Sequence, residues 1–234
     1  MNLLAIDCST EYLSLALQAG EALYCFHQHA GQRHAETMLG EISRLLERGG
    51  LRMDELNGIA YGRGPGSFTG LRIACGVTQG LAYALGIRVK GIVTLEALAE
   101  EAYAACGAEH VIACTDARMG EVYHAAYRRL GKEKHDGWTP VCAPGVYKPG
   151  DIPGIPFVEH AGPWTGCGNG FAVHGDALLK RYPDLQAVRP DLMPSARAEL
   201  VLAQAAFLKD GGDPPDQALP LYIRDNVALK KSER

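Results

Sequence analysis

The chain has 234 residues, of which 23 are Lys or Arg and 27 are Asp or Glu, so its formal net charge is −4. This charge argues against a protein whose main task is to hold nucleic acid, because affinity for phosphate backbones comes largely from positive charge. With 47% hydrophobic and 21% charged residues, and 28 glycines as its one excess, the composition disfavours intrinsic disorder and is typical of a globular protein of one or two domains.

The first hundred residues change from strand-like to helix-like patterns. Three short apolar segments joined by polar turns predict an antiparallel meander. A stripe of apolar residues at helical spacing follows, and strands and helices then alternate. The expected strands cover 3–8, 12–17, 22–28, 58–61 and 89–93, and the expected helices cover 34–48 and 69–85. A third helix is expected to begin near Thr94, with that residue as its N-cap.

The second half of the chain is less regular. Strands are expected over 111–115 and 122–128, and helices over 176–181 and 196–209. Between 131 and 170 the chain is rich in Gly and Pro and has little periodicity, which predicts short strands and loops. The charged residues at 230–234 predict a frayed tail.

The order of these elements indicates the fold class. Three antiparallel strands followed by alternating helices and strands predict a mixed sheet with helices on its faces, so the class is α/β. The same order builds the ribonuclease-H-like half of the actin, Hsp70 and sugar-kinase superfamily, whose architecture is the actin-like (ASKHA) fold. We expect two modules, one over 1–106 and a smaller, degenerate one over 107–234 whose last helix packs back on the first module.

The cysteines and the hydropathy indicate in which cellular compartment the protein works. None of the seven cysteines forms a C-x-x-C pair, so a zinc ribbon or a redox pair has no support. The first residues lack the basic start and the long apolar run of a signal peptide. The longest uncharged stretch, 73–87, is too short to span a bilayer. We therefore expect a cytoplasmic protein that does not enter a membrane.

A glycine-rich segment, GRGPGSFTGLR at 62–72, follows an expected strand and opens an expected helix. The free N–H groups and the positive end of a helix favour an anion at such a place. The segment lacks the Lys-Ser/Thr pair of a Walker A loop. The alternative is a tight, rigid turn in which glycine supplies a backbone conformation that other residues avoid.

Small residues also recur within the second expected helix. Gly76, Gly80 and Ala84 are four residues apart and share one helix face. A glycine inside a helix costs about 1 kcal/mol, which indicates that another backbone comes close to this face. The neighbour is either the chain's own sheet or a helix of another protein.

Catalytic motifs find little support. The sequence has no His-Glu-x-x-His and no Gly-x-Ser-x-Gly, and the neighbouring His27 and His29 have no acidic cluster beside them. Asp7 and Asp116 end strands, where a sugar kinase would hold Mg²⁺, but the glycine-rich phosphate loops are missing after both. Each of them is also a common turn-capping residue. We assign no catalytic residue and no metal ligand.

Five segments carry a resemblance to one family. They are AIDCST at 5–10, HAETML at 34–39, GPGSFTGLR at 64–72, TLEALA at 94–99 and DARMGEVY at 116–123. In these segments and in their order the chain resembles the bacterial TsaB family, formerly called YeaZ. The segment at 64–72 matches the family signature without a change, whereas 131–170 matches only loosely.

The resemblance implies an actin-like fold that has lost its own active site. TsaB-like proteins support the synthesis of N6-threonylcarbamoyladenosine at position 37 of tRNAs that read codons beginning with A. They pair with the catalytic paralogue TsaD, whose metal-binding His-x-x-x-His has no counterpart in this sequence. TsaE, an ATPase, joins this pair, TsaC supplies the activated intermediate, and TsaB-like proteins alone form homodimers. No cofactor is implied, nucleotide binding stays open, and contact with tRNA is at most indirect.

The resemblance assigns residues to a partner surface, and the glycine-rich segment with the two strand-end aspartates leaves a second, nucleotide or anion site open. Helices of the N-terminal module carry the dimer or partner interface, for which we expect His34, Glu36, Met38, Leu39, Ile42, Leu71, Arg72, Cys75, Gly76, Gln79, Gly80 and Tyr83. A nucleotide or anion would use Asp7, Ser9, Thr10, Gly64, Gly66, Ser67 and Asp116. The alternatives are a nucleotide-binding regulator, a small-molecule kinase of the same superfamily, and an M22-like glycoprotease.

Overall fold

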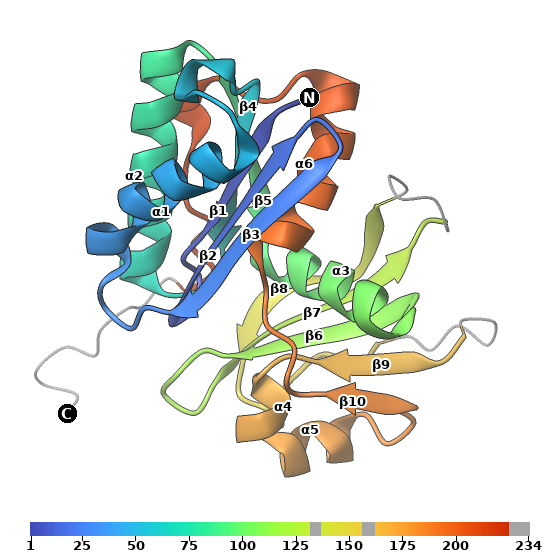
Figure 1. Cartoon of the computed structure of the whole chain (residues 1–234). Coiled ribbons are helices and arrows are strands. Elements are labelled where there is room, and N and C mark those ends of the chain that lie inside the picture. Colours follow the sequence, from blue (N-terminus) through green and yellow to red (C-terminus); the bar gives the residue numbers. More distant parts are fainter. Residues whose placement is uncertain (132–136, 156–161, 225–234) are drawn as a thin grey trace, which may run out of the picture.

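The computed structural model describes residues 1–131, 137–155 and 162–224, and they form two five-stranded sheets (Figure 1). The first sheet has the order β3-β2-β1-β4-β5. β1 lies at its centre, antiparallel to β2 and parallel to β4. The strands are β1 Leu3–Asp7, β2 Tyr12–Ala19, β3 Ala22–His29, β4 Gly58–Gly64 and β5 Arg88–Val93.

The second sheet repeats this topology. Its order is β10-β9-β6-β7-β8, with β6 at the centre, antiparallel to β7 and parallel to β9. Its first strand therefore takes the place that β1 takes in the first sheet. No repeat is visible in the sequence, so the duplication is a finding of the structure. The strands are β6 His110–Asp116, β7 Val122–Arg129, β8 Trp138–Tyr147, β9 Trp164–Cys167 and β10 Ala187–Arg189.

Helices cover the faces of both sheets. α1 (His34–Gly49) and α2 (Phe68–Leu85) bury their apolar stripes on one face of the first sheet. The short helices α4 (Gly170–Val173) and α5 (Gly175–Arg181) pack on the outer face of the second sheet. α3 (Thr94–Cys106) and α6 (Ala196–Asp210) lie between the two sheets (Figure 1). Short 3₁₀ turns cover Met53–Glu55 and Pro215–Gln217.

The two helices between the sheets each pack on the sheet formed by the other half of the chain. α3 belongs to the first 106 residues, yet its Leu95 and Leu98 are buried in the core of the second sheet. α6 comes from the second half, yet its Leu200 and Phe207 are buried against the first sheet. α6 thus packs back on the first module, as expected, and α3 is shared, because its Ala97 is buried with Leu3 and Ala60 of the first sheet.

α3 begins without a side-chain cap. Its N-cap position is Val93, and Thr94 is the first residue of the helix, which corrects the expectation that Thr94 is the cap.

The region from 131 to 170, for which short strands and loops are expected, holds the short β9 and one longer strand. β8 is a ten-residue strand that pairs with β7 along most of its length and has register shifts near its middle. These irregularities and its Pro140, Pro144 and Gly145 explain why no strand period is visible in the sequence. The rest of the region includes 132–136 and 156–161, which lie outside the described residues, as does the tail expected to be frayed. Within the described ranges, none of the helices has both the length and the apolar character needed to cross a membrane.

Candidate functional site

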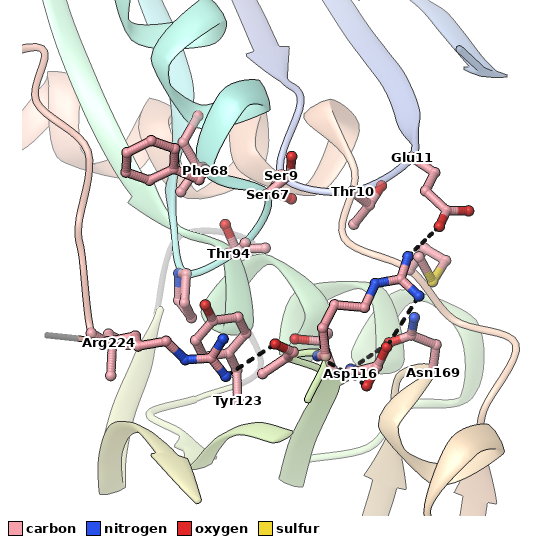
Figure 2. A pocket seen from close by; sticks show the side chains of 18 of the residues that line it. Ser9, Thr10, Glu11, Ser67, Phe68, Thr94, Asp116, Tyr123, Asn169 and Arg224 are labelled. Carbon is pink, nitrogen blue, oxygen red and sulfur yellow. Dashed lines mark hydrogen bonds and ion pairs between the residues drawn. The ribbon is translucent and has the colours of Figure 1, made fainter. Parts of the chain in front are cut away.

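A cavity of about 360 Å³ lies between the two modules. Its upper wall comes from the turn after β1 and the start of α2, and its lower wall from the turn after β6 and from Tyr123 (Figure 2). The start of α3 and the segment 221–224 close its sides. Of the residues expected to bind a nucleotide or anion, the cavity brings together Ser9, Thr10, Gly66, Ser67 and Asp116.

Ion pairs cross this cavity. The Arg118 guanidinium lies 2.5 Å from a carboxylate oxygen of Glu11 in the first module and 3.5 Å from one of Asp116 in its own. Arg224 donates to the Ala117 carbonyl at 3.1 Å and pairs with Glu121. The side-chain oxygen of Asn169 accepts a hydrogen bond from the Asp116 N–H. The acidic side chains around the cavity are therefore matched by arginines.

The glycine-rich segment builds a turn against the end of β1. The Ser67 N–H donates to the Ser9 carbonyl at 2.7 Å, and the Ser67 hydroxyl accepts from the Gly70 N–H at 3.3 Å. A Cβ atom at Gly70 would lie 1.9 Å from the Cys8 carbonyl oxygen, and one at Gly66 would lie 2.4 Å from that of Ser9. These glycines therefore allow α2 to begin close to β1, and Ser67 caps the helix from within the chain.

Asp7 and Gly64 do not line the cavity, which corrects their assignment to a nucleotide site. Asp7 is fully buried, and one of its oxygens accepts hydrogen bonds from the N–H and the hydroxyl of Ser9. Its carboxyl lies close to that of Glu199 of α6, since a Cβ atom at Gly62 would come within 2.5 Å of an oxygen of each, and burial raises the pKa of both groups. Gly64 faces Leu71 and the Leu221 carbonyl.

Five residues expected at a partner interface lie in the core of their own module. His34, Met38, Ile42, Leu71 and Cys75 are each at most 5% exposed. Met38, Ile42 and Cys75 pack in the core between their helices and the first sheet, and the ring of His34 contacts the Tyr12 carbonyl. Leu71 is buried beside Gly64 and lines the cavity between the modules. They cannot face a partner in this structure, so their assignment is corrected.

The remaining interface residues lie at the surface. Leu39 is 54% exposed and Tyr83 is 83% exposed, which is unusual for large apolar side chains. A Cβ atom placed at Gly76 or Gly80 would meet nothing within 4 Å. The small-residue face of α2 therefore points away from its own sheet, which excludes packing inside the chain as its explanation. Glu36 and Arg72 are exposed and Gln79 is half-buried on the same pair of helices.

The segment after α6 is a part of the site that the sequence analysis missed. It runs from the first module to the second along the cavity. The Tyr61 hydroxyl accepts from the Leu219 N–H at 3.0 Å, and the Leu221 N–H donates to the Arg63 carbonyl. Tyr222 lies against Phe68, with ring centroids 5.4 Å apart, and accepts from Arg72. These partners lie more than 140 positions apart, and no local pattern could reveal them.

Two modules of one topology, with a cavity between them, define a protein of the actin-like ATPase fold. Among the residues that the structure describes, there is no cluster of three or more His, Cys, Asp or Glu that could hold a metal ion.

Comparisons with known proteins give the family. The chain is 35% identical to the tRNA threonylcarbamoyladenosine biosynthesis protein TsaB of Escherichia coli, over 99% of this chain and 98% of that protein. It is 33% identical to TsaB of Haemophilus influenzae, over 99% and 97%. The profile described as TsaD, tRNA N6-adenosine threonylcarbamoyltransferase, matches residues 27–231. The chain belongs to the TsaB family.

A solved structure agrees with this assignment. The structure of YeaZ from Pseudomonas aeruginosa superposes with a TM-score of 0.85 at 36% identity, covering 94% of this chain and 99% of that one. A second structure from that organism, titled an uncharacterized protein with similarity to peptidase YeaZ, gives 0.86 at 37% identity, covering 95% and 99%. Both modules are therefore shared with these relatives.

Proposed function

We propose that this chain is a non-catalytic subunit of the machinery that makes N6-threonylcarbamoyladenosine at position 37 of tRNAs reading codons that begin with A. Its family membership supports the pathway, since the curated relatives are named for this biosynthesis. In this role the chain pairs with a TsaD-like paralogue, which performs the transfer, and a TsaE-like ATPase joins the pair. A TsaC-like enzyme supplies the intermediate, and the location is the cytoplasm.

The observation that carries the pairing is the exposed face of α1 and α2, which we call the small-residue face: Leu39, Gly40, Arg72, Gly76, Gly80, Tyr83 and Ala84. Its glycines would let a partner helix approach closely, and Leu39 and Tyr83 would lose water on contact. Without the paralogue, the same face would pair two copies of this chain. Contact with tRNA is then indirect, which agrees with the net charge of −4.

A catalytic role of the sugar-kinase type is disfavoured by the position of Asp7. That role would need a carboxylate free to hold a metal beside a nucleotide in the cavity. Here Asp7 is fully buried outside the cavity lining, and its carboxyl is bonded to the N–H and the hydroxyl of Ser9. The proposed role of the chain needs no cofactor of its own.

The test is reconstitution. TsaC, TsaD and TsaE proteins are incubated with tRNA, threonine, bicarbonate and ATP, with and without this chain, and the modified nucleoside is quantified by mass spectrometry. We expect modification only when the chain is present. Equal modification without it would overturn the proposed function.

A further inference from the structure

The two sheets end in four edge strands, and three of these edges are protected against pairing with another chain. β5 is covered by the segment after α6, because the backbones of Val89 and Asp213 exchange hydrogen bonds of 2.9 and 2.8 Å. β8 contains Pro140 and Pro144 and has register shifts, and β10 has only three residues. A covering segment, prolines, an irregular register and short length are the usual protection of a sheet edge.

β3 is the fourth edge, and it carries none of these features (Figure 1). All eight of its residues pair with β2 without a register shift. The strand contains no proline and no Lys, Arg, Asp or Glu, and its Leu23 is 48% exposed. A long and regular strand of this kind at the edge of a sheet is a template for one more strand.

The outer side of β3 presents backbone groups to such a strand. Just beyond β3, the Ala30 N–H donates to the Glu11 carbonyl at 2.9 Å. Because bonded pairs alternate along an antiparallel ladder, the even-numbered residues of β3 bond to β2, and Leu23, Cys25 and His27 direct their N–H and C=O groups away from the sheet. Within the described ranges, these outward groups have no hydrogen-bond partner.

The charges at the two ends of β3 favour a second copy of this chain as the added strand. Glu21, in the turn before β3, is exposed, and His29 at the other end has a 60% exposed side chain. The His29 contact to Glu11 uses Nε2, which leaves Nδ1 for another carboxylate. In an antiparallel pair with a two-fold axis at Cys25, Glu21 of one copy comes opposite His29 of the other. The edge is therefore complementary to itself.

We propose that β3 is a second self-association surface, on which the β3 strands of two copies pair antiparallel about a two-fold axis at Cys25. This pairing joins the two first sheets into one. The dimer is weak, because a single strand supplies the contact and stable dimers bury a larger area. The proposal goes beyond the proposed function, because it uses none of the residues of the small-residue face.

Amide hydrogen exchange of the full chain, measured by NMR at low and high protein concentration, tests this surface. The amides of Leu23 and His27 should exchange at least about fivefold more slowly at high concentration, because they gain acceptors in the second copy. Cys25→Lys places two like charges opposite each other at the axis and should abolish the effect. Cys106→Lys is the matched control, because Cys106 is also an exposed free cysteine but ends α3, and it should keep the effect.

A charge exchange tests the register. Glu21→Lys should weaken the dependence on concentration, and Glu21→Lys combined with His29→Glu should restore it. These variants keep the proposal testable should Cys25→Lys fail to fold. Exchange at Leu23 and His27 that ignores protein concentration, protection that persists in folded Cys25→Lys, or no recovery in the combined variant would overturn the proposal. Protection that appears only after a TsaD or TsaE protein is added would also overturn it, because the added strand would then belong to another protein.

Discussion

Asp7 of β1 and Glu199 of α6 form a buried pair of carboxyl groups that joins the two halves of the chain. Both side chains are 0% exposed, and a Cβ atom added at Gly62 would lie within 2.5 Å of an oxygen of each, so the two carboxyl groups are close together. Two carboxyl groups buried this close together cannot both carry a charge at low cost, so one of them keeps a proton. Burial raises the pKa of both groups, and the charge of the nearby Asp7 carboxylate raises the pKa of Glu199 further. The pair therefore links the stability of the first module to pH.

The sign of this pH dependence follows from the raised pKa values. The contribution of the pair to stability is present in full below the unfolded pKa values of about 4, and it is lost as the pH rises through the folded values. Glu199→Gln keeps the shape, donates to Asp7 and removes the shared proton. We predict that the free energy of unfolding falls less in Glu199→Gln than in the unaltered protein between pH 5 and pH 8, measured by urea denaturation.

Glu47→Gln, an exposed substitution on α1, is the control for this measurement and should follow the unaltered protein. Parallel pH profiles of the unaltered protein and Glu199→Gln would show that the pair holds no proton.

Gly62 provides the space for this carboxyl pair. A Cβ atom at Gly62 would lie 2.1 Å from an oxygen of Asp7 and 2.5 Å from one of Glu199. Gly62→Ala should therefore lower the free energy of unfolding by at least about 2 kcal/mol, because both buried groups must move. Gly76→Ala is the matched comparison, because the added methyl group points into open space. Since alanine is favoured over glycine inside a helix, this substitution should raise the free energy of unfolding by about 0.5–1 kcal/mol. Similar effects of both substitutions in thermal unfolding would contradict this role of Gly62.

His124 gives the opposite pH dependence in the second module. It is fully buried, and one ring nitrogen lies 2.8 Å from the Tyr182 hydroxyl. Burial lowers its pKa from 6.5 to about 4. Its contribution to stability is present above pH 6.5 and is lost as the pH falls through 4.

The stability advantage of the unaltered protein over His124→Gln should therefore shrink by up to about 3 kcal/mol between pH 7 and pH 4. Chemical denaturation at a series of pH values measures it, with His29→Gln at an exposed position as control. An advantage that does not change with pH would show that the ring does not stay neutral.

Tyr61 holds the segment after α6 against the first module. Its hydroxyl accepts from the Leu219 N–H and lies 3.2 Å from the Gln217 carbonyl. Tyr61→Phe removes these bonds and should cost about 1–2 kcal/mol. Hydrogen exchange should accelerate at the amides of Leu219 and Leu221 and stay unchanged at Ile6 in the centre of the sheet. Unchanged exchange at Leu219 would mean that the segment is held by its other contacts.

Most elements of the fold were predictable because they are local. The stripe of apolar residues that predicts the helix at 34–48 becomes α1, His34–Gly49, and the short apolar segments become β1, β2 and β3. The packing of α6 on the first module was also expected, whereas the irregular β8 and the burial of α3 in the core of the second sheet were not predictable, because they depend on packing between segments far apart in the sequence.

The candidate sites were predicted only in part for two physical reasons. The periodicity that reveals a helix also marks its inner side, so Met38 and Ile42 belong to the core and not to a partner surface. The Asp7–Glu199 pair and the Tyr61–Leu219 bond join residues separated by more than 150 positions, which leave no local signal. In contrast, Gly76 and Gly80 interrupt an otherwise apolar helix, and that local signal marked the right helix face, which the structure then shows to be exposed.

The central claim is that the small-residue face is where this chain meets its partner. Gly76→Leu and Gly80→Leu place a bulky side chain in open space, so the monomer should keep its fold, which circular dichroism checks. Gly175→Leu is the matched control, because this glycine of α5 also faces open space but lies in the second module.

The most direct measurement is the yield of modified tRNA in the reconstituted reaction with each variant, together with co-elution of the chain with the TsaD protein in size-exclusion chromatography. We predict that Gly76→Leu and Gly80→Leu lose both co-elution and at least tenfold of the yield, while Gly175→Leu retains both. Full co-elution and full yield with Gly76→Leu and Gly80→Leu would contradict the account.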